Sequence, residues 1–186
     1  MLSFTSNLSS KSNAIVLFVA ENYSYKDKNK ILSKELAKKI NLFLKSLKEK
    51  NKKEEISSFD ISDKKKCFII KVKSKYENYY FEEVGGAFFA YIKKFKDINS
   101  IDIDADGINE NRDKLIKCFS KFIFGFNLKS YTFQKYKTSN KEKINNKIDY
   151  KIITSYKNKI DSIYKYYNAI KEGIFLTRDL VSEPPN

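Results

Sequence analysis

The sequence predicts an α/β fold in which a mixed central sheet lies between helices on both of its faces. Apolar runs of strand length alternate along the chain with longer segments whose apolar residues recur at intervals of three and four. Such alternation is typical of layered α/β domains, because helices that follow strands cover the sheet. The 186 residues, 41% of them hydrophobic, suffice for one domain with a sizeable core. The chain contains no internal repeat.

The expected strands differ in pattern. The first two are continuous apolar runs, as in strands that are buried on both faces. In the third, Ile101 and Ile103 alternate with Asp102 and Asp104, which is the period of a strand. Tyr79–Phe81 is either a short strand or the approach to the next helix. The expected strands are Ala14–Ala20, Cys67–Val72, Ile101–Asp104, Tyr131–Tyr136 and Tyr150–Thr154.

Four segments place apolar residues on one helical face: 31–47, 84–95, 115–126 and 160–174. A polar loop is expected at 21–30, a solvated helix end or loop at 49–55, and a polar segment rich in lysine and asparagine at 139–147. We expect the last helix to pack on the sheet through Ile160, Ile163, Tyr164, Tyr167, Ile170 and Ile174.

The end of the chain carries more apolar surface than a chain end needs. Phe175, Leu176, Leu180 and Val181 follow the expected core-facing stripe, and Pro184-Pro185 is expected to end the helix. Part of this surface should therefore stay exposed, as it does where a partner is missing.

The net charge of +14 suggests nucleic acid as one class of partner. Arginine, however, occurs only at Arg112 and Arg178, and the lysines are mixed with abundant Asn, Ile and Tyr. Readers of bases and phosphates favour arginine for its bidentate fork. We therefore interpret the charge as compositional drift and expect nucleic-acid binding to be weak and non-specific at most.

Several other classes of protein are disfavoured. No apolar run has the length of a membrane-spanning helix, and the N-terminus does not resemble a secretory signal. Cys67 and Cys118 are expected to be buried free thiols in a reducing compartment. The chain has no histidine, which disfavours a zinc site and excludes serine–histidine and cysteine–histidine nucleophiles within it.

Three local patterns have both a functional and a structural interpretation. Residues 102–107 resemble the start of a calcium loop, but Asn109 and Asp113 break the pattern, and a strand end that turns into a helix is favoured. Gly85-Gly86 either offers N–H groups to an anion or allows close packing of a helix on the sheet, which we favour. Tyrosines at 23–25, 76–80 and 164–167 either stack on single strands or form the rim of the core, and the second is commoner.

The last eleven residues, Leu176–Asn186, are similar to the linker of the leucine aminopeptidase (cytosol aminopeptidase) family, with Ser182 where Asn is commoner. Phe124–Thr138 contains a second similar run, of the form Leu-x-x-Tyr-x-Phe-x-x-Tyr-Lys-Thr. Gly85-Gly86-Ala87 is a third point of likeness. The order and spacing of the three agree with the amino-terminal domain of that family, whereas residues 1–75 carry no matching motif.

The resemblance implies a macro-like amino-terminal domain over residues 1–172 and the start of an interdomain linker over 173–186. In the family, two divalent metal ions, zinc or manganese, lie in a catalytic domain that follows, within a cytoplasmic hexamer that removes N-terminal amino acids from peptides. The family's metal-binding lysine and acidic run are not in this sequence. The resemblance therefore assigns no catalytic, cofactor-binding or metal residue to this chain. A free-standing macro-like module for a phosphorylated nucleotide or nucleic acid is the alternative.

Overall fold

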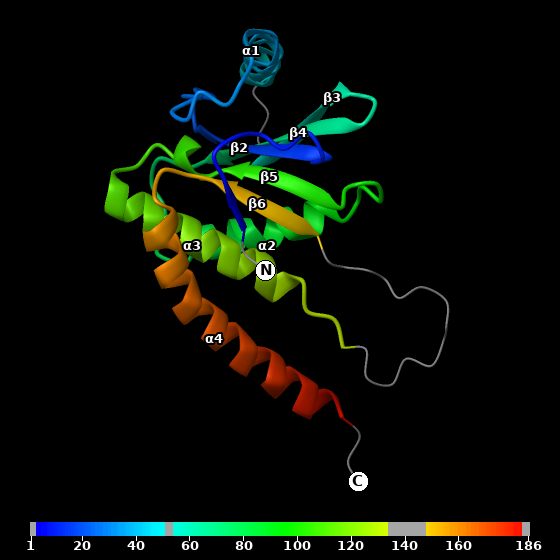
Figure 1. Cartoon of the computed structure of the whole chain (residues 1–186), viewed down its shortest axis with the longest axis vertical. Helices are drawn as coiled ribbons and strands as arrows, with labels where there is room; N and C mark the ends of the chain where they lie inside the picture. Colours follow the sequence, from blue (N-terminus) through cyan, green and yellow to red (C-terminus); the bar gives the residue numbers. More distant parts are fainter. Residues whose placement is uncertain (1–2, 51–53, 134–147, 184–186) are drawn as a thin grey trace.

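The structure is a computed structural model that describes residues 3–50, 54–133 and 148–183, and it contains a six-stranded sheet (Figure 1). The strand order is β1-β6-β5-β2-β4-β3. All neighbouring strands are parallel except β3 and β4, which form an antiparallel hairpin, so the predicted mixed sheet is confirmed. The strands are β1 (Ser3–Thr5), β2 (Ala14–Ala20), β3 (Ile56–Ser62), β4 (Lys65–Val72), β5 (Ser100–Asp104) and β6 (Asp149–Ile153).

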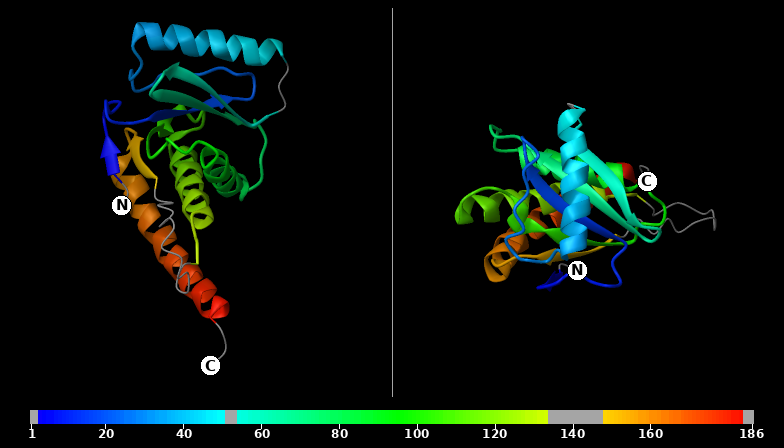
Figure 2. Two further views of the ribbon diagram at one scale, coloured as in Figure 1. Left: turned by 90° about the vertical axis from the view of Figure 1, so that its right-hand side faces the viewer. Right: turned by 90° about the horizontal axis from the view of Figure 1, so that it is seen from above.

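Helices lie on both faces of this sheet, which confirms the predicted three layers. Helix α1 (Lys34–Glu49) covers one face, while α2 (Tyr80–Ile92), α3 (Arg112–Lys129) and α4 (Lys157–Ser182) lie on the other side (Figure 2). Each face has its own hydrophobic core. A short 3₁₀ helix, η1 (Ala105–Gly107), directly follows β5. No helix among the described residues is long and apolar enough to cross a membrane.

Local sequence explains where the first and third helices begin. The Ser33 hydroxyl accepts a hydrogen bond from the Leu36 N–H at 3.2 Å, and the Asn111 side chain accepts one from the Lys114 N–H at 3.1 Å. Both are N-cap interactions that satisfy an otherwise unpaired backbone donor. The predicted apolar faces of these helices are buried, through Ile40 and Leu44 in α1 and Phe119 in α3 among others.

Some predicted elements differ from the observed ones. Strands β1 and β3 were not predicted, and Tyr80 and Phe81 begin α2 instead of forming a strand. Tyr131–Phe133 is not a strand, so that prediction was wrong for the part of 131–136 that the structure describes. The remainder of that segment, the polar loop 139–147 and Pro184-Pro185 lie outside the described residues.

Helix α4 packs on α3, not directly on the sheet as the sequence predicted. Its contacts with other elements are chiefly to α3, and only Ile160 is fully buried. Tyr167 lies against Phe124 of α3 with 5.0 Å between ring centroids. The helix runs on past the body of the domain, so its last turns project away from the sheet (Figures 1 and 2).

Candidate functional site: the outer face of the last helix

Exposed apolar side chains gather on α4. Seven large hydrophobic residues are exposed in the part of the chain that the structure describes, and five of them belong to this one helix. They are Tyr166, Ile170, Leu176, Leu180 and Val181. The expectation that part of the terminal apolar surface stays exposed is confirmed for Leu176, Leu180 and Val181, while Phe175 is half-buried.

Four of these five residues, all but Val181, belong to one continuous stripe, because Tyr166, Ile170, Gly173, Thr177 and Leu180 follow one another at steps of four and three residues. Ala169 and Leu176 flank them on the same side of the helix. We call the stripe the outer face of α4: Tyr166, Ala169, Ile170, Gly173, Leu176, Thr177 and Leu180. It contains no charged residue, although 32% of the chain is charged.

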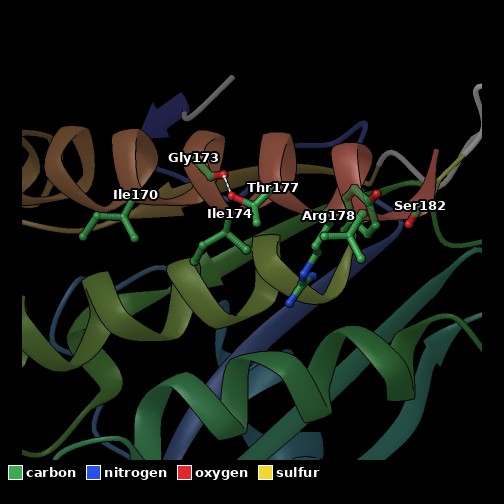
Figure 3. Close-up of a pocket in the computed structure, with 8 residues that line it drawn as sticks. Ile170, Gly173, Ile174, Thr177, Arg178 and Ser182 are labelled. Carbon is green, nitrogen blue, oxygen red and sulfur yellow. Dashed lines mark hydrogen bonds between the residues drawn. The ribbon is translucent and has the colours of Figure 1, made fainter. Parts of the chain in front are cut away.

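Gly173 stands at the middle of the outer face with open space around it. A Cβ atom added there would meet nothing within 4 Å. The Thr177 hydroxyl donates to the Gly173 carbonyl at 2.9 Å, so this polar group is satisfied within the helix (Figure 3). Glycine in a helix interior costs about 1 kcal/mol relative to alanine, and no contact within the described chain requires it here.

A side-chain clip holds the projecting half of α4 to the end of α3. Tyr131 donates a hydrogen bond to Asp179 at 2.7 Å, and its ring lies 5.0 Å from that of Phe175. Arg178 lies over the same Tyr131 ring and donates to the Leu128 carbonyl at 3.3 Å. A groove of about 550 Å³ runs beside this clip, between Tyr131 and a row of α4 residues (Figure 3).

Two pairs of oppositely charged residues on α4 are matched within the helix. Lys165 pairs with Asp161 at 3.2 Å and Lys171 with Glu172 at 3.0 Å. Lys165 and Glu172 are the members of these pairs that lie beside the outer face, so the charges that border it are locally balanced.

The aspartates at the end of β5 and in η1 do not form a calcium loop. Asp104 is fully buried and accepts hydrogen bonds from Tyr25 at 2.7 Å and Asn29 at 2.9 Å, both in the loop that follows β2. Asp106 accepts from Thr154 and from the Ser155 N–H. Within the described residues, no group of three or more His, Cys, Asp or Glu side chains is placed to hold a metal ion.

Burial, together with the neighbouring carboxylates Asp106 and Asp27, raises the pKa of the Asp104 carboxyl to about 6, although the hydrogen bonds from Tyr25 and Asn29 lower it. Burial also raises the pKa of both cysteine thiols, Cys67 and Cys118. The two cysteines are free and buried, as the sequence predicted. Their protonated thiols are poor nucleophiles.

The glycine pair of α2 and the tyrosine clusters have structural roles. Gly85 lies against the backbone of α3 and not against the sheet, so the close packing is between two helices. Tyr76 and Tyr80 stack on each other at 5.3 Å beside the core. Tyr79, in contrast, is exposed.

No family model matches the chain. It is 33% identical over 105 residues to the probable cytosol aminopeptidase of Agrobacterium fabrum. This match covers 55% of this chain and 20% of that protein. It is 32% identical over 107 residues to the probable cytosol aminopeptidase of Phytoplasma mali, covering 56% and 21%. The chain is therefore similar in sequence to one part of these two cytosol aminopeptidases. It spans about a fifth of the length of these relatives.

Solved structures of low sequence identity share the fold. A mutant of tomato leucine aminopeptidase superposes with a TM-score of 0.68 at 14% identity, over 99% of this chain and 39% of that one. The bottromycin maturation enzyme BotP in complex with Mn gives 0.59 at 11% identity, over 93% and 32%. The macrodomain of Thermus aquaticus DarG gives 0.54 at 12% identity, over 83% and 98%. The predicted macro-like architecture is therefore confirmed.

Proposed function

We propose that the chain is the non-catalytic amino-terminal domain of a leucyl aminopeptidase-like metallo-exopeptidase, where it supports oligomer assembly and shapes access to the active site. The observation that carries the proposal is the sequence similarity to cytosol aminopeptidases over a fifth of their length. The fold agreement with tomato leucine aminopeptidase over nearly the whole chain supports it. The uncharged outer face of α4 supplies a surface suited to assembly.

The proposal places the chemistry elsewhere in a parent protein. There, two zinc or manganese ions would activate water against the N-terminal peptide bond of a peptide substrate, within a cytoplasmic hexamer. A manganese complex of the fold relative BotP supports the choice of metal. Residues 1–172 would form the domain and 173–186 the start of the linker, with α4 running unbroken through that boundary.

A second candidate is a free-standing module that binds a phosphorylated nucleotide. It is supported by the macrodomain of DarG, which the fold match covers almost entirely. Against it, buried Asp104 ends β5 and buried Asp106 lies in η1 directly after it, at the carboxyl end of the parallel strands, and carboxylates there oppose an anionic ligand. Titration of the chain with ADP-ribose separates the candidates, since binding in the micromolar range would favour the module.

The principal experiment replaces the matching segment of the Phytoplasma mali protein with this chain. We expect the chimaera to release leucine from a leucyl chromogenic substrate in the presence of manganese, and the isolated chain to release none. The contribution of the outer face of α4 is tested by introducing Leu180→Lys into the chimaera. Leu42→Lys on α1 is its control, since both leucines are about equally exposed. Steady turnover by the isolated chain would contradict the assignment, as would a folded chimaera that stays inactive.

A further inference from the structure

Gly173 marks the centre of symmetry of the outer face of α4. Tyr166 and Leu180 each lie seven residues from it, one before and one after, and both have large side chains. Ile170 and Leu176 each lie three residues from it. Ala169 and Thr177, which are both small, each lie four residues from it. The face therefore presents the same order of large and small side chains when it is read in either direction.

We propose that two copies of this chain dimerise through the outer face of α4, with the two helices antiparallel and crossing at Gly173. A two-fold axis through that glycine would pair Tyr166 of each copy with Leu180 of the other, and Ile170 with Leu176. An interface of this kind uses the same patch on both subunits, so it must be self-complementary. The absence of a side chain at the crossing point lets the two helix backbones approach closely.

Electrostatics are compatible with a second copy as the occupant. Each copy carries a net charge of +14, which opposes association in general. The outer face, however, contributes no charge, and the charged residues beside it, Lys165 and Glu172, are each paired within their own helix. The projecting half of α4 also extends away from the sheet (Figure 1), so an antiparallel pair would keep the two basic domain bodies at opposite ends.

The inference deepens the assembly role proposed above, but it is tested on this chain alone. The outer face is about 21 Å long, from a rise of 1.5 Å per residue over the fourteen steps from 166 to 180. A single pair of helices is a small interface, so the dimer is weak and concentration-dependent. The chimaera experiment tests relation to the aminopeptidases, whereas the oligomeric state of the isolated chain tests this pairing. Either proposal can therefore fail without the other.

The test that fixes geometry is disulfide formation under a mild oxidant. Gly173→Cys should cross-link to itself, since the two Cβ atoms would lie near the two-fold axis. Tyr166→Cys should not cross-link to itself but should do so when mixed with Leu180→Cys. The native cysteines are buried and should not react. Leu42→Cys, at an exposed leucine on α1, is the control and should stay monomeric.

The second test is sedimentation across a range of protein and salt concentrations. Dimerisation should strengthen as salt rises, because salt screens the repulsion between the two basic bodies. Leu180→Lys should weaken dimerisation by about tenfold or more, because the two-fold axis would bury one added charge from each copy in the interface. The equally charged Leu42→Lys should not weaken it. Gly173→Lys should act like Leu180→Lys and keep its native circular dichroism, since nothing lies near that position. A chain that stays monomeric throughout, equal effects of the two leucine variants, or self-linked Tyr166→Cys would each overturn the proposal.

Discussion

Gly85 of α2 and Gly125 of α3 each lie directly against the backbone of the other helix where the two helices cross. A Cβ atom on Gly85 would lie far inside the van der Waals contact distance to the Phe122 carbonyl oxygen, and one on Gly125 far inside that distance to the Glu82 carbonyl oxygen. These obstacles are backbone atoms, which cannot swing away as a flexible side chain can. The pair thus sets how closely α2 and α3 pack beneath the sheet.

Gly85→Ala and Gly125→Ala should therefore each lower the free energy of unfolding by about 3 kcal/mol, at the upper end of the cost of overpacking a core. Chemical denaturation followed by circular dichroism measures the change. Gly86→Ala is the matched control, because its nearest neighbour is 3.7 Å away. It should be neutral or should stabilise the protein by up to about 1 kcal/mol through helix propensity. Equal losses at Gly85 and Gly86 would show that the close approach is not what matters.

The sequence predicted the sheet centre and the helices well because each carries a strong, uninterrupted pattern. Ala14–Ala20 is apolar throughout and became the central strand β2. Strand β3 (Ile56–Ser62) escaped prediction because it is a half-exposed edge strand in which serine and aspartate break the alternation. Strand β1 has only three residues, too few to show a period.

The candidate site was partly predictable. Part of the apolar surface formed by Phe175, Leu176, Leu180 and Val181 was expected to be exposed, because it exceeds what a chain end needs. The roles of Tyr166 and Gly173 were not predicted, although the step of three and four that joins them is visible in the sequence. The outer face was not recognised, because α4 was interpreted as a helix that packs on the sheet. Sequence periodicity gives the apolar faces of a helix but not which neighbour each face meets, and here α3 lies between α4 and much of the sheet.

The burial of Asp104 also depended on tertiary structure. Alternation in β5 places Asp102 and Asp104 on the face that α1 covers elsewhere, where Ile15 and Leu17 of β2 are their register partners. Loops cover these two aspartates: Ser9 donates its N–H to Asp102, while Tyr25 and Asn29 bond to Asp104. The local sequence of neither loop predicts these hydrogen bonds to residues far away in the chain.

Asp104 should make stability depend on pH. Its pKa is about 6 in the fold against an ordinary value of 3.8 for an aspartate, so the folded protein favours the protonated form. The stabilising contribution of protonated Asp104 is fully present below its pKa in the unfolded chain, and it is lost as the pH rises toward its pKa in the fold. The loss is on the order of 3 kcal/mol in total.

Asp104→Asn isolates this effect, because the amide removes the charge while its oxygen still accepts a hydrogen bond. Its stability relative to wild type should rise between pH 5 and pH 7.5, as measured by urea denaturation at each pH. Asp149→Asn, at an exposed position on β6, is the control and should leave the pH dependence unchanged. A constant difference between Asp104→Asn and wild type across this range would contradict the assignment.

Tyr167 should contribute moderately to stability. It is half-buried against Phe124 and not in the core, so its loss exposes less apolar surface than a core aromatic would. Tyr167→Ala should lower the free energy of unfolding by about 1–2 kcal/mol, below the range for a fully buried aromatic. Tyr166→Ala, at a neighbouring exposed tyrosine, should cost less than half as much when both are compared by thermal denaturation at low protein concentration.

Binding to duplex DNA should be non-specific and should weaken steeply with salt. Nearly all the positive charge is lysine, which attracts phosphate as a point charge without reading bases. Fluorescence anisotropy with two unrelated duplexes should give the same affinity for both, with a loss of at least about tenfold between 50 and 200 mM salt. Preference for one duplex that survives at the higher salt would overturn the interpretation of the charge as compositional drift.

The clip between Tyr131 and Asp179 should control the order of the last turns of α4. Tyr131 holds this half of the helix through one hydrogen bond, ring contact with Phe175 and the guanidinium of Arg178. Tyr131→Ala removes all three contacts, so amide hydrogen exchange in residues 174–182 should accelerate by about tenfold, the loss of roughly 1.4 kcal/mol of local stability.

Tyr131→Phe keeps the ring and loses only the hydrogen bond, so it should accelerate exchange by a smaller factor. Exchange in residues 158–166, where α4 packs on α3, should not change in either variant, because those contacts do not involve Tyr131. Measurements belong at low protein concentration, where pairing through the outer face is absent. If both variants exchange like wild type over 174–182, the projecting turns are held by the helix alone. If 158–166 accelerates equally, α4 unfolds as one unit and the clip has no local role.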